Sequence, residues 1–120
     1  MQFLGAISYT ANASITRGRI MDIFDEQGKK LLHALLALKD EGEMQSFLID
    51  ICTIQEIQSL TQRFHVATLL KKGLTYDKIC EVTGASKATI SRVNRALTWG
   101  EHGYNLAISR LEQQAQESEE

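Results

Sequence analysis

The sequence of 120 residues contains no proline, and only 7% of its residues are aromatic. Proline interrupts helices, and apolar residues recur at helical spacing from Asp22 onward without a sustained alternating pattern, so we predict an all-α protein. No apolar run approaches the length of a membrane span, and we therefore expect no membrane partner. Apolar residues at 43% and charged residues at 23% are typical of one soluble domain.

Cysteine and histidine are too few and too scattered for a disulfide framework or a metal site. Cys52 and Cys80 have no companions at metal-ligand spacing, which indicates a reducing cytoplasm. His33, His65 and His102 are separated by more than thirty residues each. The sequence also lacks a nucleophile elbow, a phosphate loop and a plausible carboxylate pair. We therefore predict a cytoplasmic protein that is not an enzyme and has no catalytic residues, metal or cofactor.

Residues 75–98 have the pattern of two short helices joined by a tight turn. Thr75 and Ser86 are suited to cap the two helices, and Gly84 can adopt the left-handed conformation that a sharp turn requires. Each helix turns one apolar stripe toward the other, formed by Tyr76, Ile79 and Val82 in the first helix and by Ile90, Val93 and Leu97 in the second. Cys80 is small enough for close approach, and this spacing is that of a helix-turn-helix.

The outward side of the second helix, residues 86–98, carries small and basic side chains. Hydroxyl groups can reach bases or phosphates, Ala88 can pack on a thymine methyl group, and Lys87 and Arg95 can neutralise phosphates. The predicted DNA-binding residues are Lys78, Ser86, Lys87, Ala88, Thr89, Ser91, Arg92 and Arg95. The alternative is an ordinary helical hairpin whose polar side faces water.

Four short motifs in residues 53–97 carry a resemblance to a known family. They are T-x-x-E starting at Thr53, L-x-x-R ending at Arg63, LL-x-x-G ending at Gly73, and GAS-x-ATISR from Gly84 to Arg92. This run is similar to the core of the Trp-repressor superfamily, and most closely to the Trp-repressor-like YerC/YecD family of bacterial proteins. The similarity extends more loosely over residues 21–111. The resemblance implies an all-helical, intertwined homodimer that binds double-stranded DNA.

The same resemblance suggests where a small-molecule corepressor would bind. Two arginines surround the tryptophan in the Trp repressor, and Arg63 and Arg92 match them. The repressor has a glycine where this chain has Val93, and a serine where this chain has Ala96, so open space and a polar partner are both lost. The possible ligand pocket thus comprises Arg63, Arg92, Val93 and Ala96, but we predict no dependence on tryptophan.

The resemblance also divides the chain into three parts. Residues 1–20 should be a loose N-terminal tail, residues 21–112 the Trp-repressor-like domain, and residues 113–120 a polar, acidic tail that frays. Met21 is a candidate natural start, because the similarity begins near it. Thr98, Trp99 and Gly100 mark the boundary before a last amphipathic helix, and we expect Trp99 to pack against protein rather than to stack on DNA or a ligand.

Two apolar helices are expected in the first part of the domain. The first spans residues 22–39 with Gly28 as its weak point, residues 40–42 break the chain, and the second spans residues 43–52. Their wide apolar surface, in view of the resemblance, is interpreted as the core of a dimer. A monomeric bundle core is the alternative.

A long helix should follow, with a capping box formed by Thr53 and Glu56 at its start and Lys72 near its end. Its predicted apolar stripe comprises Ile54, Ile57, Leu60, Phe64, Ala67 and Leu70. This helix leads directly into the helix-turn-helix.

Charge is distributed unevenly along the chain. Residues 63–95 contain seven basic and two acidic residues, whereas the remainder has six basic and thirteen acidic residues. An acidic protein with one basic segment fits DNA binding through a local patch. We predict a dimeric, sequence-specific transcriptional regulator, a repressor that places residues 86–98 in the major groove of a palindromic operator. The alternatives are a repressor responding to tryptophan or another small ligand, and a helical protein-interaction module.

Overall fold

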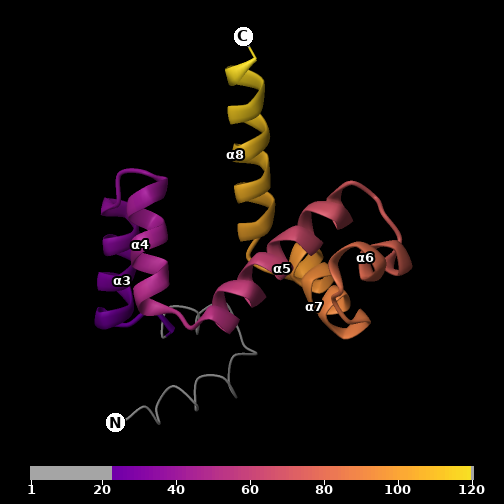
Figure 1. The fold of residues 1–120 in the computed structure, drawn as a ribbon, viewed down its shortest axis with the longest axis horizontal. Coiled ribbons are helices and arrows are strands. Elements are labelled where there is room, and N and C mark those ends of the chain that lie inside the picture. The colour runs from indigo at the N-terminus through magenta and orange to yellow at the C-terminus, as the bar shows by residue number, and fades with distance from the viewer. Residues whose placement is uncertain (1–22, 120) are drawn as a thin grey trace. The chain divides into compact units, whose positions relative to one another are not determined.

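The computed structural model describes residues 23–119, and no strand lies among them. The helices are α3 (Glu26–Ala37), α4 (Glu41–Ile51), α5 (Ile54–Lys71), α6 (Tyr76–Thr83), α7 (Lys87–Trp99) and α8 (Gly103–Ser118), as labelled in Figure 1. The predicted all-α fold is thereby confirmed. The chain divides into two compact units, residues 1–48 and 49–120. The predicted tail of residues 1–20 lies outside the described residues.

The start of α3 differs from the prediction. Asp25 caps this helix, because its Oδ1 accepts a hydrogen bond of 2.9 Å from the backbone N–H of Gly28. The helical run is therefore interrupted at Phe24 and Asp25 rather than at Gly28. A glycine in the first turn costs the helix little, since its N–H is satisfied by the cap. The weak point predicted at Gly28 is wrong.

The break between α3 and α4 also lies earlier than predicted. Asp40 Oδ1 accepts a hydrogen bond of 2.9 Å from the N–H of Glu43, while Glu43 Oε1 accepts one of 2.8 Å from the N–H of Lys39. This reciprocal pair starts α4 at Glu41, so Gly42 lies inside the first turn instead of breaking the chain. Asp40 is a residue type that caps helices. Its hydrogen bond fixes the start of α4 despite the low helix propensity of Gly42 two residues later.

The wide apolar surface of the first two helices is open to solvent in a single chain. Neither α3 nor α4 contains a buried residue. Leu36 is 82% exposed and Ile49 is 65% exposed. Apolar side chains exposed to this extent are costly to leave in water, at about 25 cal/mol per Å². The described helices thus supply the surface that a dimer core would need.

The core of the second unit is built where α5, α6, α7 and α8 meet. Its buried residues are Val66, Ala67 and Leu69 of α5, Ile79 of α6, Ala85 of the turn, Ile90, Val93 and Leu97 of α7, and Ile108 of α8. Figure 1 shows α6 and α7 packed together against α5. No helix of the described part is long and apolar enough to cross a membrane.

The apolar stripe predicted for α5 is only partly buried. Ile54 is 74% exposed and Leu60 is 45% exposed, whereas burial begins at Val66. The reason is that the side chains of α6 and α7 in the core meet only the second half of α5. Ala67 is buried, and Phe64 and Leu70 pack partly buried against the core, so the predicted stripe is confirmed in the second half of α5 and wrong for Ile54 and Leu60 in a single chain.

Two expectations for the C-terminal part are also corrected. Helix α8 continues to Ser118, so the fraying expected from residue 113 onward is wrong over that range. The residues concerned are polar helix formers, and their composition does not end a helix. Trp99 is 81% exposed, so the expected packing of its ring is absent in a single chain.

Candidate nucleic-acid interface

Local hydrogen bonds shape the two helices and the turn as the sequence predicts. Thr75 caps α6 by accepting a 3.2 Å hydrogen bond from the N–H of Lys78, and Ser86 caps α7 by accepting one of 3.1 Å from Thr89. Gly84 ends α6 in the left-handed region with φ of 75°, and its N–H donates to the carbonyl of Cys80 at 2.8 Å. The helix-turn-helix geometry therefore follows from two caps and one glycine.

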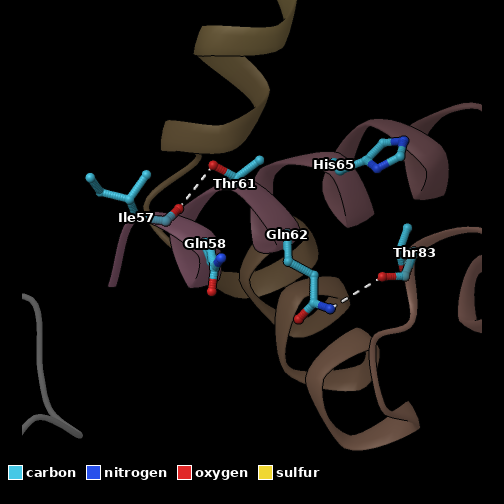
Figure 2. Close-up of a pocket in the computed structure, with 6 residues that line it drawn as sticks. All are labelled: Ile57, Gln58, Thr61, Gln62, His65 and Thr83. Carbon is cyan, nitrogen blue, oxygen red and sulfur yellow. Dashed lines mark hydrogen bonds between the residues drawn. The ribbon is translucent and has the colours of Figure 1, made fainter. Parts of the chain in front are cut away.

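The side chain of Thr83, which was not predicted from the sequence, stabilises the turn through hydrogen bonds. Thr83 Oγ1 donates to the carbonyl of Ile79 at 2.7 Å and accepts from the N–H of Ala85 at 3.1 Å. The side-chain amide of Gln62 donates to the carbonyl of Thr83 at 3.3 Å, and Figure 2 shows this bond linking α5 to the end of α6. The position of Thr83, directly before the turn glycine, was the only available signal.

Helix α7 has one buried and one exposed face. Ile90, Val93 and Leu97 are buried, as predicted from their spacing. The predicted DNA-binding residues that are exposed are Lys78, Ser86, Lys87, Ala88, Arg92 and Arg95, and those that are half-buried are Thr89 and Ser91. The hydroxyl of Thr89 is already engaged, because Ser86 Oγ donates to it at 3.2 Å. The structure thus brings the predicted residues together on α7 and the adjoining part of α6.

Two lysines of this surface are paired with carboxylates that sequence reasoning had treated only as charges. Lys87 Nζ lies 2.9 Å from Asp77 Oδ1, and Lys78 Nζ lies 3.3 Å from Glu81 Oε1. The hydrogen bond to Lys87 and its charge lower the pKa of Asp77, and the same contact raises the pKa of Lys87. The Lys78–Glu81 pair could have been found from its i, i+3 spacing. The Asp77–Lys87 pair could not, because it depends on the turn.

The predicted ligand-pocket residues differ in their surroundings. Val93 is only 2% exposed and belongs to the core, whereas Arg92 is exposed and Arg63 is half-buried. Ala96 lines a concavity between α5 and α8, together with Phe64 and Tyr104, but the other three predicted pocket residues do not line it. The valine side chain is therefore packed in the core of the second unit.

One further pocket and the arrangement of possible metal ligands are also candidates for a functional site. A shallow pocket in Figure 2 is lined by Ile57, Gln58, Thr61, Gln62, His65 and Thr83. It contains no charged pair and lies on the side of α5 near the end of α6. Among residues 23–119, no group of three histidine, cysteine or acidic side chains could hold a metal ion.

Among the described residues, six helices, no strand and a capped helix-turn-helix define an all-α protein of the helix-turn-helix class. The family model of the Trp repressor protein matches residues 26–112. The chain belongs to the Trp repressor family, which confirms the resemblance drawn from the motifs at residues 53–97.

The relatives agree in sequence and in fold. The uncharacterized protein YerC of Bacillus subtilis (strain 168) is 48% identical over 101 residues, covering 82% of this chain and 97% of that protein. The crystal structure of a TrpR-like protein from Eubacterium eligens ATCC 27750 matches with a TM-score of 0.72 and 49% identity, covering 75% of this chain and 93% of that one. A candidate Trp repressor from Staphylococcus aureus matches with a TM-score of 0.74 and 41% identity, covering 78% and 94%.

Proposed function

We propose that this chain is a sequence-specific, DNA-binding transcriptional regulator, a repressor that acts as a homodimer. The observation that carries the proposal is the division of α7 into a buried apolar face and an exposed face with Lys87, Arg92 and Arg95. Membership of the Trp repressor family supports the same function. A helix held by its apolar side, with small and basic residues outward, is suited to the major groove.

In the proposed complex, α7 lies in the major groove and α6 crosses the backbone. Lys78, Lys87 and Arg95 neutralise phosphates, and Arg92 reaches a phosphate or a guanine edge. Ser86, Ala88, Thr89 and Ser91 contribute hydroxyl or methyl contacts near the start of α7. The small side chains there allow the helix backbone to approach the bases closely.

The homodimer is proposed from the apolar surface that a single chain leaves open. Helices α3 and α4 contain no buried residue, and apolar side chains such as Leu36 and Ile49 are largely exposed. A two-fold dimer would remove this surface from water and present two copies of α7 to successive major grooves. A palindromic operator follows from that symmetry. Sedimentation equilibrium should give the mass of a dimer, and a monomer at micromolar concentration would contradict it.

A mobility-shift assay over a salt series tests the proposed function. Random-sequence duplexes are expected to bind at low salt and to dissociate steeply as salt rises, because phosphate contacts release counterions. Repeated selection from the same library should then enrich a palindrome. If no complex forms even at low salt, DNA binding is excluded and the helical hairpin is better explained as a protein-interaction module.

Removing a cation from α7 should weaken binding to every DNA sequence. For Lys87→Ala or Arg95→Ala, each lost phosphate contact lowers the magnitude of the salt slope by up to about 0.9 per bound subunit. Thr89→Ala should instead change which sequence is preferred, because a hydroxyl near the bases is lost. Mobility shifts of each variant against the wild type provide the measurement.

Arg110 provides a matched control for these variants. It is an exposed cation on α8, outside the helix-turn-helix. Arg110→Ala should leave both affinity and salt slope close to the wild type. An unchanged slope for Lys87→Ala, or an equal loss for Arg110→Ala, would show that the DNA-facing surface is placed wrongly.

Tryptophan is not expected to regulate this protein. The buried Val93 side chain occupies space beside Arg92, and Ala96 offers no side-chain acceptor to a ligand amino group. Calorimetric titration with L-tryptophan should show no binding, and the mobility shift should be the same with and without it. Micromolar binding that tightens the DNA complex would establish the alternative, a tryptophan-responsive repressor.

A further inference from the structure

An ion pair joins the two helices of the proposed DNA-binding surface. Asp77 lies in the first turn of α6, Lys87 is the first residue of α7, and their side chains meet at 2.9 Å. Ten positions separate them in the sequence, and the turn at Gly84 brings them together. Both side chains are well exposed, at 83% for Asp77 and 67% for Lys87. The pair therefore forms on the side that DNA would approach.

The electrostatic environment explains why this pair forms. The N-terminus of a helix carries a partial positive charge, which disfavours a cation at Lys87 and favours an anion at Asp77. The carboxylate lies close enough for a charge-assisted hydrogen bond to the ammonium group. Because both groups face water, the pair is weak and can exchange partners readily. A DNA phosphate is the natural competitor for the same ammonium group.

We propose that Asp77 is a positioning residue that holds Lys87 at the start of α7 and competes with DNA phosphate for its ammonium group. This inference rests on the proposed function. Binding to DNA then requires Lys87 to exchange a carboxylate for a phosphate, so the protein binds arbitrary DNA more weakly than its number of cations implies. The same carboxylate holds the ammonium group of Lys87 at the start of α7 in the free protein.

A second acidic residue on α6 provides the matched control. Glu81 pairs with Lys78 at 3.3 Å within the same helix, and neither residue lies at the start of α7. Glu81→Gln removes the same charge from the same helix as Asp77→Asn. Because Lys78 is itself a proposed phosphate contact, Glu81→Gln frees a different lysine, and any gain in binding should persist in a Lys87→Ala background. The inference requires the gain from Asp77→Asn to depend on Lys87 instead.

The experiment measures binding of full-length variants to a short random-sequence duplex over a salt series. Asp77→Asn should bind severalfold more tightly at low salt, because Lys87 no longer has to exchange a carboxylate for a phosphate. In a Lys87→Ala background, Asp77→Asn should lose most of that gain. Any gain from Glu81→Gln should persist in the same Lys87→Ala background, because Glu81 pairs with Lys78. Matching thermal unfolding midpoints for Asp77→Asn and the wild type would show that the fold is intact.

Two binding results would overturn the inference. They are unchanged binding by Asp77→Asn, and a gain from Asp77→Asn that is undiminished in the Lys87→Ala background. Each of these leaves the proposed function standing, since the wild type still binds DNA. Failure of the wild type to bind any duplex would overturn both proposals together.

A carboxyl NMR titration of the free protein examines the ion pair without DNA. The pKa of Asp77 should lie below its ordinary value and rise in Lys87→Ala, because the hydrogen bond and the positive charge are removed. The pair is therefore intact at neutral pH and is lost as the pH falls through the lowered pKa. An Asp77 pKa that does not respond to Lys87→Ala would overturn the inference whatever the DNA result.

Discussion

Replacing Ile79 with alanine is expected to lower the free energy of unfolding by about 2 to 5 kcal/mol. Ile79 is completely buried and is the only buried residue of α6. Its removal leaves a cavity between α6 and the core formed by α5 and α7, in addition to the lost transfer energy. Urea denaturation followed by circular dichroism, at one fixed protein concentration, gives the measurement.

Val82 on the same helix supplies the control. Its side chain is 48% exposed, so Val82→Ala removes less buried surface and should cost much less than Ile79→Ala. Because α6 carries Lys78, a proposed phosphate contact, the disturbed packing of α6 in Ile79→Ala should also weaken DNA binding. Similar losses for the two variants would contradict the burial of Ile79 as the main contact of α6 with the core.

Replacing Gly84 with valine is expected to cost about 2 kcal/mol or more, because a β-branched residue is strained in the left-handed region. The backbone φ at Gly84 is 75°, and no atom lies within 4 Å of an added Cβ. The cost is therefore one of backbone conformation rather than of steric overlap with neighbours. Thermal and urea unfolding of the variant against the wild type should show it.

Asparagine at position 84 distinguishes strain in the backbone conformation from steric overlap of the side chain with its neighbours. Asparagine adopts the left-handed conformation more readily than other residues with a side chain, so Gly84→Asn should cost clearly less than Gly84→Val. The Cβ that either variant adds would have no neighbour within 4 Å outside residues 83–85. Equal stability of the valine variant and the wild type would exclude the left-handed turn.

Local chemistry in the sequence was sufficient for the helix-turn-helix. Thr75, Gly84 and Ser86 act on atoms within a few residues of themselves, so their caps and turn could be predicted without knowledge of the fold. The capping box of Thr53 and Glu56 is confirmed for the same reason. The burial of Ile90, Val93 and Leu97 followed from helical periodicity.

Local signals were misjudged where two of them competed. Near Gly28 and Gly42 the low helix propensity of glycine was given more weight than the caps Asp25 and Asp40, whose hydrogen bonds determine where α3 and α4 begin. At the C-terminus, the polar composition after residue 112 predicts fraying. That segment has no residue that ends a helix, and α8 continues to Ser118. These errors concern boundaries and leave the fold class unchanged.

The sequence by itself determined the helices, the turn and the outward face of α7, because each depends on interactions between neighbouring residues. The tertiary structure decided how far each apolar stripe is covered. Periodicity shows that Ile54 and Leu60 share a face with Ala67, but only the positions of α6 and α7 leave the first two exposed. The tertiary structure also decided that Lys87 meets Asp77. This ion pair forms only after the turn has brought the N-termini of α6 and α7 together.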